Sequence, residues 1–161
     1  MTMDFKRPVR IIYLVEDSVL VASLVTLMAL AAMQIGLRNF FDTGVVWADT
    51  LVRILVLWVA LLGAMVATRE NNHIKIDLLS RYLSEQLNRR VSAIVGTFAA
   101  IICGVASWYC LEFVLLESED PTIAFAGIPH WVCEAILPFA FAVMSLRFLL
   151  GVVDSYAAKD G

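Results

Sequence analysis

Four ionisable residues of this chain, Asp49, Arg53, Glu112 and Glu134, lie inside or at the edges of long apolar stretches. A charge in the hydrocarbon of a membrane is costly, so residues at such positions need an explanation. Carboxylates there can relay protons or ions, and an arginine can neutralise them. Asp49 and Arg53 are four residues apart, so they can pair along one helix face. Arg53 could instead reach Glu112 or Glu134 on a neighbouring helix.

Two interpretations of this polar cluster are open. The first is a proton or ion relay coupled to transport. The second is a neutralised cluster that fixes helix packing or a contact with another subunit. One arginine lies among several acids, and no acid lies near the centre of a span. This arrangement favours the structural interpretation.

The histidines and cysteines do not form a metal or haem site in the sequence. Bis-histidine haem ligation needs two imidazoles at similar membrane depth. His73 follows the second span and His130 precedes the fourth, so we expect the two histidines at opposite faces of the membrane. Cys103, Cys110 and Cys133 form no C-x-x-C pair and are interpreted as small packing residues. We therefore predict no cofactor, no metal and no catalytic centre.

The composition requires a non-aqueous environment for the helices that carry these residues. Of the 161 residues, 61% are hydrophobic and only 17% are charged, and the mean hydropathy is +0.83. A soluble domain would have about a quarter charged residues and under half apolar ones. The net charge of −3 comes with no basic stripe, so nucleic-acid binding is not indicated.

Four stretches approach or exceed the length of about 20 apolar residues that crosses a membrane. The first follows a basic N-terminal tail, and no small-residue cleavage site closes this apolar stretch, so we expect a retained span rather than a signal peptide. The second and fourth reach full length only by including charged residues at their ends. We predict an all-α integral membrane protein, with one membrane domain over 1–161 and four transmembrane helices at about 18–37, 45–68, 91–115 and 131–153.

Basic residues in the short loops predict the orientation. They are frequent in the N-terminal tail and between the second and third spans, and absent between the third and fourth spans. We therefore expect a multi-pass protein of the bacterial inner membrane with both termini in the cytoplasm. The residues that carry this prediction are Lys6, Arg7 and Arg10 in the tail, and Arg69, Lys75, Arg81, Arg89 and Arg90 in the middle loop.

The middle loop has its own helical pattern. Apolar residues recur at helical spacing over 74–83, with charged residues opposite. A short amphipathic helix in the cytoplasmic interface fits this pattern, and a helical turn that merely links two spans fits it equally. Ser84 followed by Glu85 is an N-cap signal for the start of the third helix.

Small residues predict where helices approach closely. Gly96, Ala100 and Gly104 form a small-xxx-small line on the third span, and Gly63 with Ala67 forms another on the second.

Aromatic residues predict the outer boundary of the membrane. Trp47, Trp108, Tyr109 and Trp131 are placed as an aromatic belt would be, whereas Trp58 lies mid-span and would pack against protein or lipid.

The second span and the middle loop carry an ordered motif. It opens with Trp47-Ala-Asp49-Thr-Leu-Val-Arg53 and continues with Trp58, Gly63-Ala64, Ala67, Arg69 and His73-Ile-Lys-Ile-Asp77-Leu78. A second motif, Gly127-Ile-Pro129-x-Trp131 followed by Pro138, precedes the fourth span. Together they resemble the small permease subunit of tripartite ATP-independent periplasmic (TRAP) transporters. Thr50 stands where many members have a second acid, so Asp49 is the only acid at that place.

The resemblance implies a non-catalytic partner of a large permease subunit, which carries the substrate and sodium sites. A periplasmic solute-binding protein would deliver an organic acid, and an ion gradient would drive its import. The residues of these motifs and of the polar cluster would then be structural or subunit-interface residues: Trp47, Asp49, Arg53, Trp58, Arg69, His73, Asp77, Glu112 and Glu134. The alternative is a structural membrane anchor of a respiratory or other enzyme complex, which has no evident need for the ordered motif.

Overall fold

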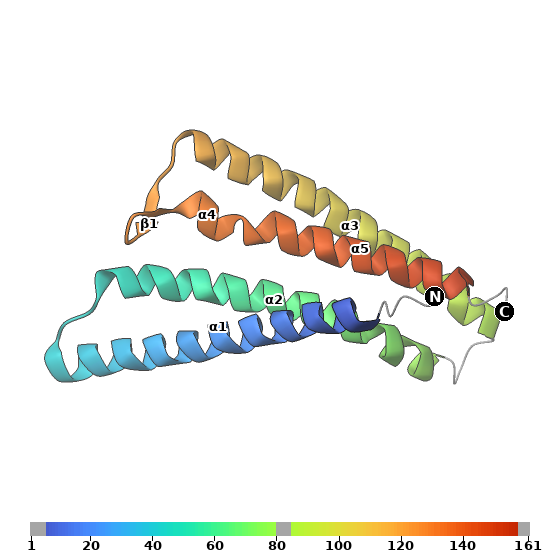
Figure 1. The fold of residues 1–161 in the computed structure, drawn as a ribbon, viewed down its shortest axis with the longest axis horizontal. Coiled ribbons are helices and arrows are strands. Elements are labelled where there is room, and N and C mark those ends of the chain that lie inside the picture. Colours follow the sequence, from blue (N-terminus) through green and yellow to red (C-terminus); the bar gives the residue numbers. More distant parts are fainter. Residues whose placement is uncertain (1–5, 80–84, 158–161) are drawn as a thin grey trace.

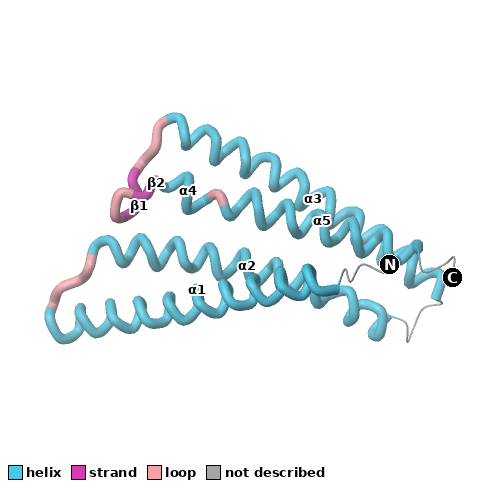
Figure 2. The backbone as a smooth tube through the Cα atoms, in the orientation of Figure 1, coloured by secondary structure: helices cyan, strands magenta, loops and turns pink. Residues whose placement is uncertain are grey.

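The computed structural model describes residues 6–79 and 85–157. Within these ranges the chain is almost wholly helical (Figures 1 and 2). Four helices are long and apolar enough to cross a membrane, which confirms the predicted all-α fold with four spans. In order, the elements are α1 (Lys6–Phe41), α2 (Val46–Leu79), α3 (Glu85–Glu119), β1 (Ile123–Phe125), β2 (Ile128–Pro129), α4 (His130–Glu134) and α5 (Ile136–Ala157).

The helices form two antiparallel hairpins that lie side by side (Figure 1). One hairpin is α1 with α2, and the other is α3 with α4 and α5. Helix α5 also packs against α2 and so joins the two hairpins. The first turn of α1 and the last turn of α5 lie at the same end of the bundle, and the β1–β2 turn lies at the opposite end.

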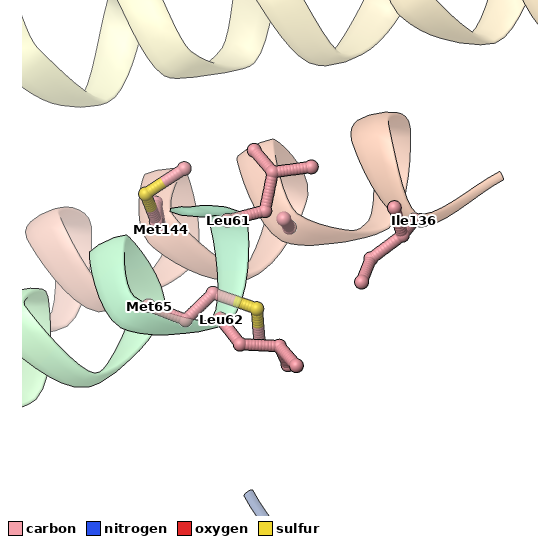
Figure 3. Packing of buried hydrophobic residues seen from close by; sticks show 6 residues of the cluster. Leu61, Leu62, Met65, Ile136 and Met144 are labelled. Carbon is pink, nitrogen blue, oxygen red and sulfur yellow. The ribbon is translucent and has the colours of Figure 1, made fainter. Parts of the chain in front are cut away.

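The buried core is small and lies mainly between α2 and α5. Leu61 and Met65 of α2 face Ala140 and Met144 of α5 in a cluster completed by Leu62 and Ile136 (Figure 3). Most large side chains of α1 and α3 are exposed in the isolated chain. A surface this apolar is the surface of a protein solvated by lipid or covered by another membrane protein.

Close packing between α3 and α5 depends on glycine. A Cβ atom added to Gly96 would lie 2.7 Å from Val152 Cγ2, and one added to Gly104 would lie 3.4 Å from Ser145 Oγ. The Ser145 hydroxyl donates a hydrogen bond to the Ala100 carbonyl at 2.8 Å. The predicted small-residue line on the third span is therefore a helix contact, as expected. Gly63 differs, because no atom lies within 4 Å of a Cβ placed there.

The fourth span is not one helix, as the sequence analysis had assumed, but two. The helix is interrupted at Ala135, a turn residue between α4 and α5 whose dihedral angles remain in the right-handed helical region. Pro138 explains the break, because proline has no N–H to donate to the carbonyl four residues earlier. Hydrogen bonds from other helices reach carbonyls around the break: Trp58 Nε1 donates to Cys133 O at 2.9 Å, and Ser107 Oγ donates to Pro138 O at 2.9 Å.

The segment after the second span continues α2 without interruption as far as Leu79. Residues 74–79 are therefore part of α2 and do not form a separate amphipathic helix. Residues 80–84 lie outside the described ranges. Helix α3 is described from Glu85 onward, and the predicted N-cap residue Ser84 lies outside the described ranges.

Between α3 and α4 the chain makes a short hairpin that the sequence analysis did not anticipate. Strand β1 pairs antiparallel with β2. The two residues between them, Ala126 and Gly127, have φ values of 48° and 83°. Positive φ at both central residues is the geometry of a type I′ turn, which glycine favours.

Candidate functional site

A cluster of charged residues ties three helices together at the end of the bundle that holds the start of α1 and the end of α5. We call it the Glu16 cluster; it consists of Tyr13, Glu16, Asp17, Arg69 and Arg147. Nη2 of Arg147 on α5 lies 2.9 Å from both carboxylate oxygens of Glu16 on α1. Nη2 of Arg69 on α2 lies 2.9 and 3.2 Å from the two carboxylate oxygens of Asp17.

Three of the four charged side chains of the Glu16 cluster are shielded from solvent, and the fourth, Asp17, is 46% exposed. The exposed fractions of the Glu16, Arg147 and Arg69 side chains are 8%, 15% and 16%. Both guanidinium groups lie over the Tyr13 ring, at 4.7 Å for Arg69 and 5.7 Å for Arg147. The two acids and two arginines cancel in formal charge, which is how charges are tolerated in a low-dielectric interior. The cluster is therefore suited to holding α1, α2 and α5 together.

The sequence motifs do not indicate this cluster, although Arg69 belongs to one of them. The positions of the charged residues at the ends of the spans nevertheless contain a signal for this cluster. Glu16 and Asp17 precede the first span, while Arg69 and Arg147 lie toward the ends of the second and fourth. With alternating span directions, all four residues come to one membrane face. Comparing the charges at each face would have indicated the pairing.

A second polar group closes the α1–α2 hairpin at the other end. Asp49 accepts hydrogen bonds from Gln34 Nε2 at 2.9 Å and from Arg38 Nη2 at 2.6 Å. Gln34 also holds the loop: its Nε2 donates to the Val45 carbonyl, and its Oε1 accepts from the Val45 amide. We call this group the Gln34 clamp. An open hollow of 410 Å³ lies beside it, lined by Arg38, Asp49 and the loop residues Asp42, Thr43 and Gly44.

The expected pair between Asp49 and Arg53 is therefore wrong. The side chain of a helical residue leans toward the N-terminus of its helix, and in α2 this brings Asp49 to Gln34 and Arg38. Arg53 is exposed, and within the described ranges no ion pair joins it to Glu112 or Glu134. Glu112 is exposed as well, and Glu134 is half-buried with no hydrogen-bond partner for Oε2 in the described part of the chain.

The remaining motif residues have different surroundings. The side chain of Trp47 is half exposed, and Trp58 packs against the α2–α5 core while bonding the Cys133 carbonyl. The backbone of His73 and Asp77 belongs to α2, but their side chains lie outside the described part of the structure.

A family model for the DctQ component of tripartite ATP-independent periplasmic transporters matches residues 27–157. The chain belongs to this family. The match covers most of the chain and both helix hairpins, including the Gln34 clamp, Trp58 and both arginines of the Glu16 cluster.

Curated relatives are similar over much of the same region. The sialic acid TRAP transporter permease protein SiaT of Haemophilus influenzae is 28% identical over 119 residues, which cover 72% of this chain and 19% of that protein. The small permease protein SiaQ of Vibrio cholerae is 27% identical, covering 63% of this chain and 62% of SiaQ. The small permease protein DctQ of Rhodobacter capsulatus is 31% identical, covering 65% and 46%. The chain thus spans less than two thirds of each relative's length.

Membership of the DctQ family fixes the class of the protein. The family consists of transporter components rather than enzymes, so the prediction that the chain is not an enzyme is confirmed by its relatives. Together with the four spans, membership identifies a multi-pass protein of the inner membrane. The Glu16 cluster and the Gln34 clamp are then polar contacts that hold the helices of a TRAP component in register.

Proposed function

We propose that this chain is the small, non-catalytic permease subunit of a TRAP-type secondary transporter that imports an organic acid using a sodium gradient. The observation that carries the proposal is the DctQ family match over 27–157. The internal pairing of charges in the Glu16 cluster agrees with a supporting role. A substrate site for an anion would need unpaired cationic or polar groups facing an enclosed space.

The first proposed partner is a large permease subunit. In SiaT and in the isethionate TRAP permease DctMQ of Oleidesulfovibrio alaskensis, the matched region makes up only 19% and 16% of a longer permease protein. A region fused to a larger permease in relatives is expected to contact such a permease where the two are separate chains. The second proposed partner is a periplasmic solute-binding protein that delivers the substrate, and membrane lipid would cover the remaining apolar surface.

The proposed orientation places both termini and the middle segment in the cytoplasm. The basic residues of the N-terminal tail and of the middle segment support it through the positive-inside rule. The acidic residues between α3 and β1 would then face the periplasm, together with the Gln34 clamp. The loops at that end are the ones that a solute-binding protein could reach.

The proposed substrate is a carboxylate or similar organic anion. The relatives are named for sialic acid, C4-dicarboxylates and isethionate, all of which are anionic. The family match favours this transporter role over the alternative of a structural anchor for an enzyme complex.

Uptake by cells that express or lack this chain tests the proposal. Cells that contain a TRAP large permease and a solute-binding protein would be given radiolabelled sialic acid, succinate and isethionate with and without a sodium gradient. We expect sodium-dependent accumulation of one of these anions, lost without the chain and restored by supplying it. Equal uptake with and without the chain would contradict the proposal.

A further inference from the structure

The arginine within the second span has no counterpart in the described part of the chain. Arg53 on α2 is exposed, and no hydrogen bond or ion pair to another described residue satisfies its guanidinium group. By contrast, Arg69 and Arg147 are paired within the Glu16 cluster, and Arg38 is paired with Asp49.

The depth of Arg53 makes its lack of a partner informative. Arg53 and Arg69 are separated by 16 residues of one helix, or about 24 Å. The hydrocarbon core is about 30 Å thick. With Arg69 near one boundary, Arg53 lies inside the hydrocarbon. Glu112 differs, because it follows Arg90 by 22 residues, or about 33 Å, and can lie at the level of the lipid headgroups.

The helix face that carries Arg53 is not covered by the rest of the chain. Val56, Ala60 and Ala67 are exposed on the same side of α2, and no atom lies within 4 Å of a Cβ at Gly63. The spacings of 3, 7, 10 and 14 residues from Arg53 place all four on one stripe of the helix. The opposite side of α2, with Leu61 and Met65, packs against α5. We call this uncovered stripe the Arg53 face.

We propose that the Arg53 face is the surface on which a transmembrane helix of the large permease packs, with an Asp or Glu of that helix paired to Arg53. Charge complementarity supplies the first argument, since an arginine at this depth requires an anion. The small side chains supply the second, since they let two helix backbones approach closely, as Gly96 and Gly104 do between α3 and α5. This inference rests on the proposed function.

The other long exposed helix surfaces are better suited to lipid. The exposed residues of α1 between Ser18 and Leu37 include no charge. Those of α3 between Val91 and Leu111 are likewise uncharged, and many are large aliphatic or aromatic side chains. Such surfaces are solvated well by lipid tails and need no protein counterpart.

Photo-crosslinking in membranes that contain the large permease tests which surface is covered. A benzophenone amino acid would be placed at Val56, Ala60 or Ala67 on the Arg53 face. Matched controls would carry it at Ala22 and Ala29, which are exposed positions on α1. We expect an adduct with the large permease from the α2 positions and at least about tenfold less from α1. Adducts with a second copy of this chain, or with lipid alone, would overturn the inference.

Substitution at the same face tests the contact energetically. Gly63→Leu should reduce co-purification of the large permease at least about tenfold, a change of about 1.4 kcal/mol. Gly36→Leu is the matched control, because a Cβ there also meets no atom within 4 Å. Both variants should leave the melting temperature of the isolated subunit unchanged, so a loss of association cannot come from misfolding. Equal association for both would count against the inference.

Arg53 itself distinguishes a carboxylate from a lipid phosphate as its counterion. If a permease carboxylate pairs with it, Arg53→Gln should weaken association about tenfold or more, and Arg53→Lys much less. Arg53→Glu should be rescued by a lysine in place of one acid of the permease. Unchanged association of Arg53→Gln would assign the charge to lipid and overturn the inference. If the wild-type chain retains no large permease at all, the proposed function fails; if it does but not through this face, only this inference fails.

Discussion

At the scale of single residues, the chain pairs most of its membrane charges across helices rather than along them. Glu16 and Arg147 are far apart in sequence, but Nη2 of Arg147 donates to both carboxylate oxygens of Glu16. Asp49 likewise bonds Gln34 and Arg38 of α1 although Arg53 is four residues away on its own helix. Cross-helix pairing fixes the helices relative to one another, which a pair along one helix cannot do. The paired charges therefore join α1 to α2 and to α5.

The Glu16 cluster gives the first prediction. Glu16→Gln should destabilise the bundle by about 3–5 kcal/mol, because it leaves Arg147 as an uncompensated buried charge. Glu119→Gln is the matched control, since Glu119 is exposed. Denaturant titration in detergent micelles measures both. Equal midpoints for the two variants would contradict a structural role for the cluster.

The hydrogen bond of Trp58 gives a second prediction at this scale. Trp58→Phe removes the donor to the Cys133 carbonyl while keeping an aromatic ring in the core, so it should cost about 1 kcal/mol. Trp108→Phe, at an exposed position, should cost almost nothing. The comparison is made from melting temperatures, and a Trp58→Phe variant as stable as Trp108→Phe would be evidence against the bond.

At the scale of helices and strands, the sequence predicted what depends on composition and periodicity. The four spans and the close approach along Gly96, Ala100 and Gly104 both follow from local patterns. The break at Ala135 could not be predicted from Pro138 alone. Whether a helix breaks near a proline depends on which of its carbonyls accept hydrogen bonds from other helices, and the sequence does not show these contacts. The partner of Asp49 was missed because it depends on how the loop after α1 folds back.

Helix packing gives the third prediction. Gly96→Leu should cost about 1–3 kcal/mol, because its Cβ would lie 2.7 Å from Val152 Cγ2 and force α3 away from α5. Gly36→Leu, with no atom within 4 Å of its Cβ, serves as the control. Thermal unfolding followed by circular dichroism should show a lower midpoint for Gly96→Leu alone. A shared midpoint would mean that the two helices are not in close contact.

At the scale of the whole molecule, the bundle has a small core and a large apolar surface. Much of α1 and α3 is exposed, and only α5 of the second hairpin makes extensive contact with α2. A chain of this design is suited to being one component of a larger membrane assembly, in agreement with its family. The sequence motifs indicated that family, whereas the uncovered face of α2 became visible only once the packing of its other side was known.

The orientation gives the fourth prediction. A reporter fused after Gly161 should report a cytoplasmic location, and a reporter inserted near Asp120 should report a periplasmic location. The reason is that the basic residues are expected on the opposite side of the membrane from Asp120. Alkaline phosphatase and green fluorescent protein fusions read the two compartments. Reversal at either site would invert the proposed orientation.

The central claim is that this chain works as the small subunit of a larger permease, and affinity isolation from native membranes tests it most directly. The chain, tagged at its C-terminus and expressed at its normal level, would be extracted in mild detergent and its partners quantified by mass spectrometry. We predict a large multi-span permease in a ratio near one to one, retained through size-exclusion chromatography. A monodisperse chain without such a partner, or one bound instead to a respiratory enzyme, would contradict the account.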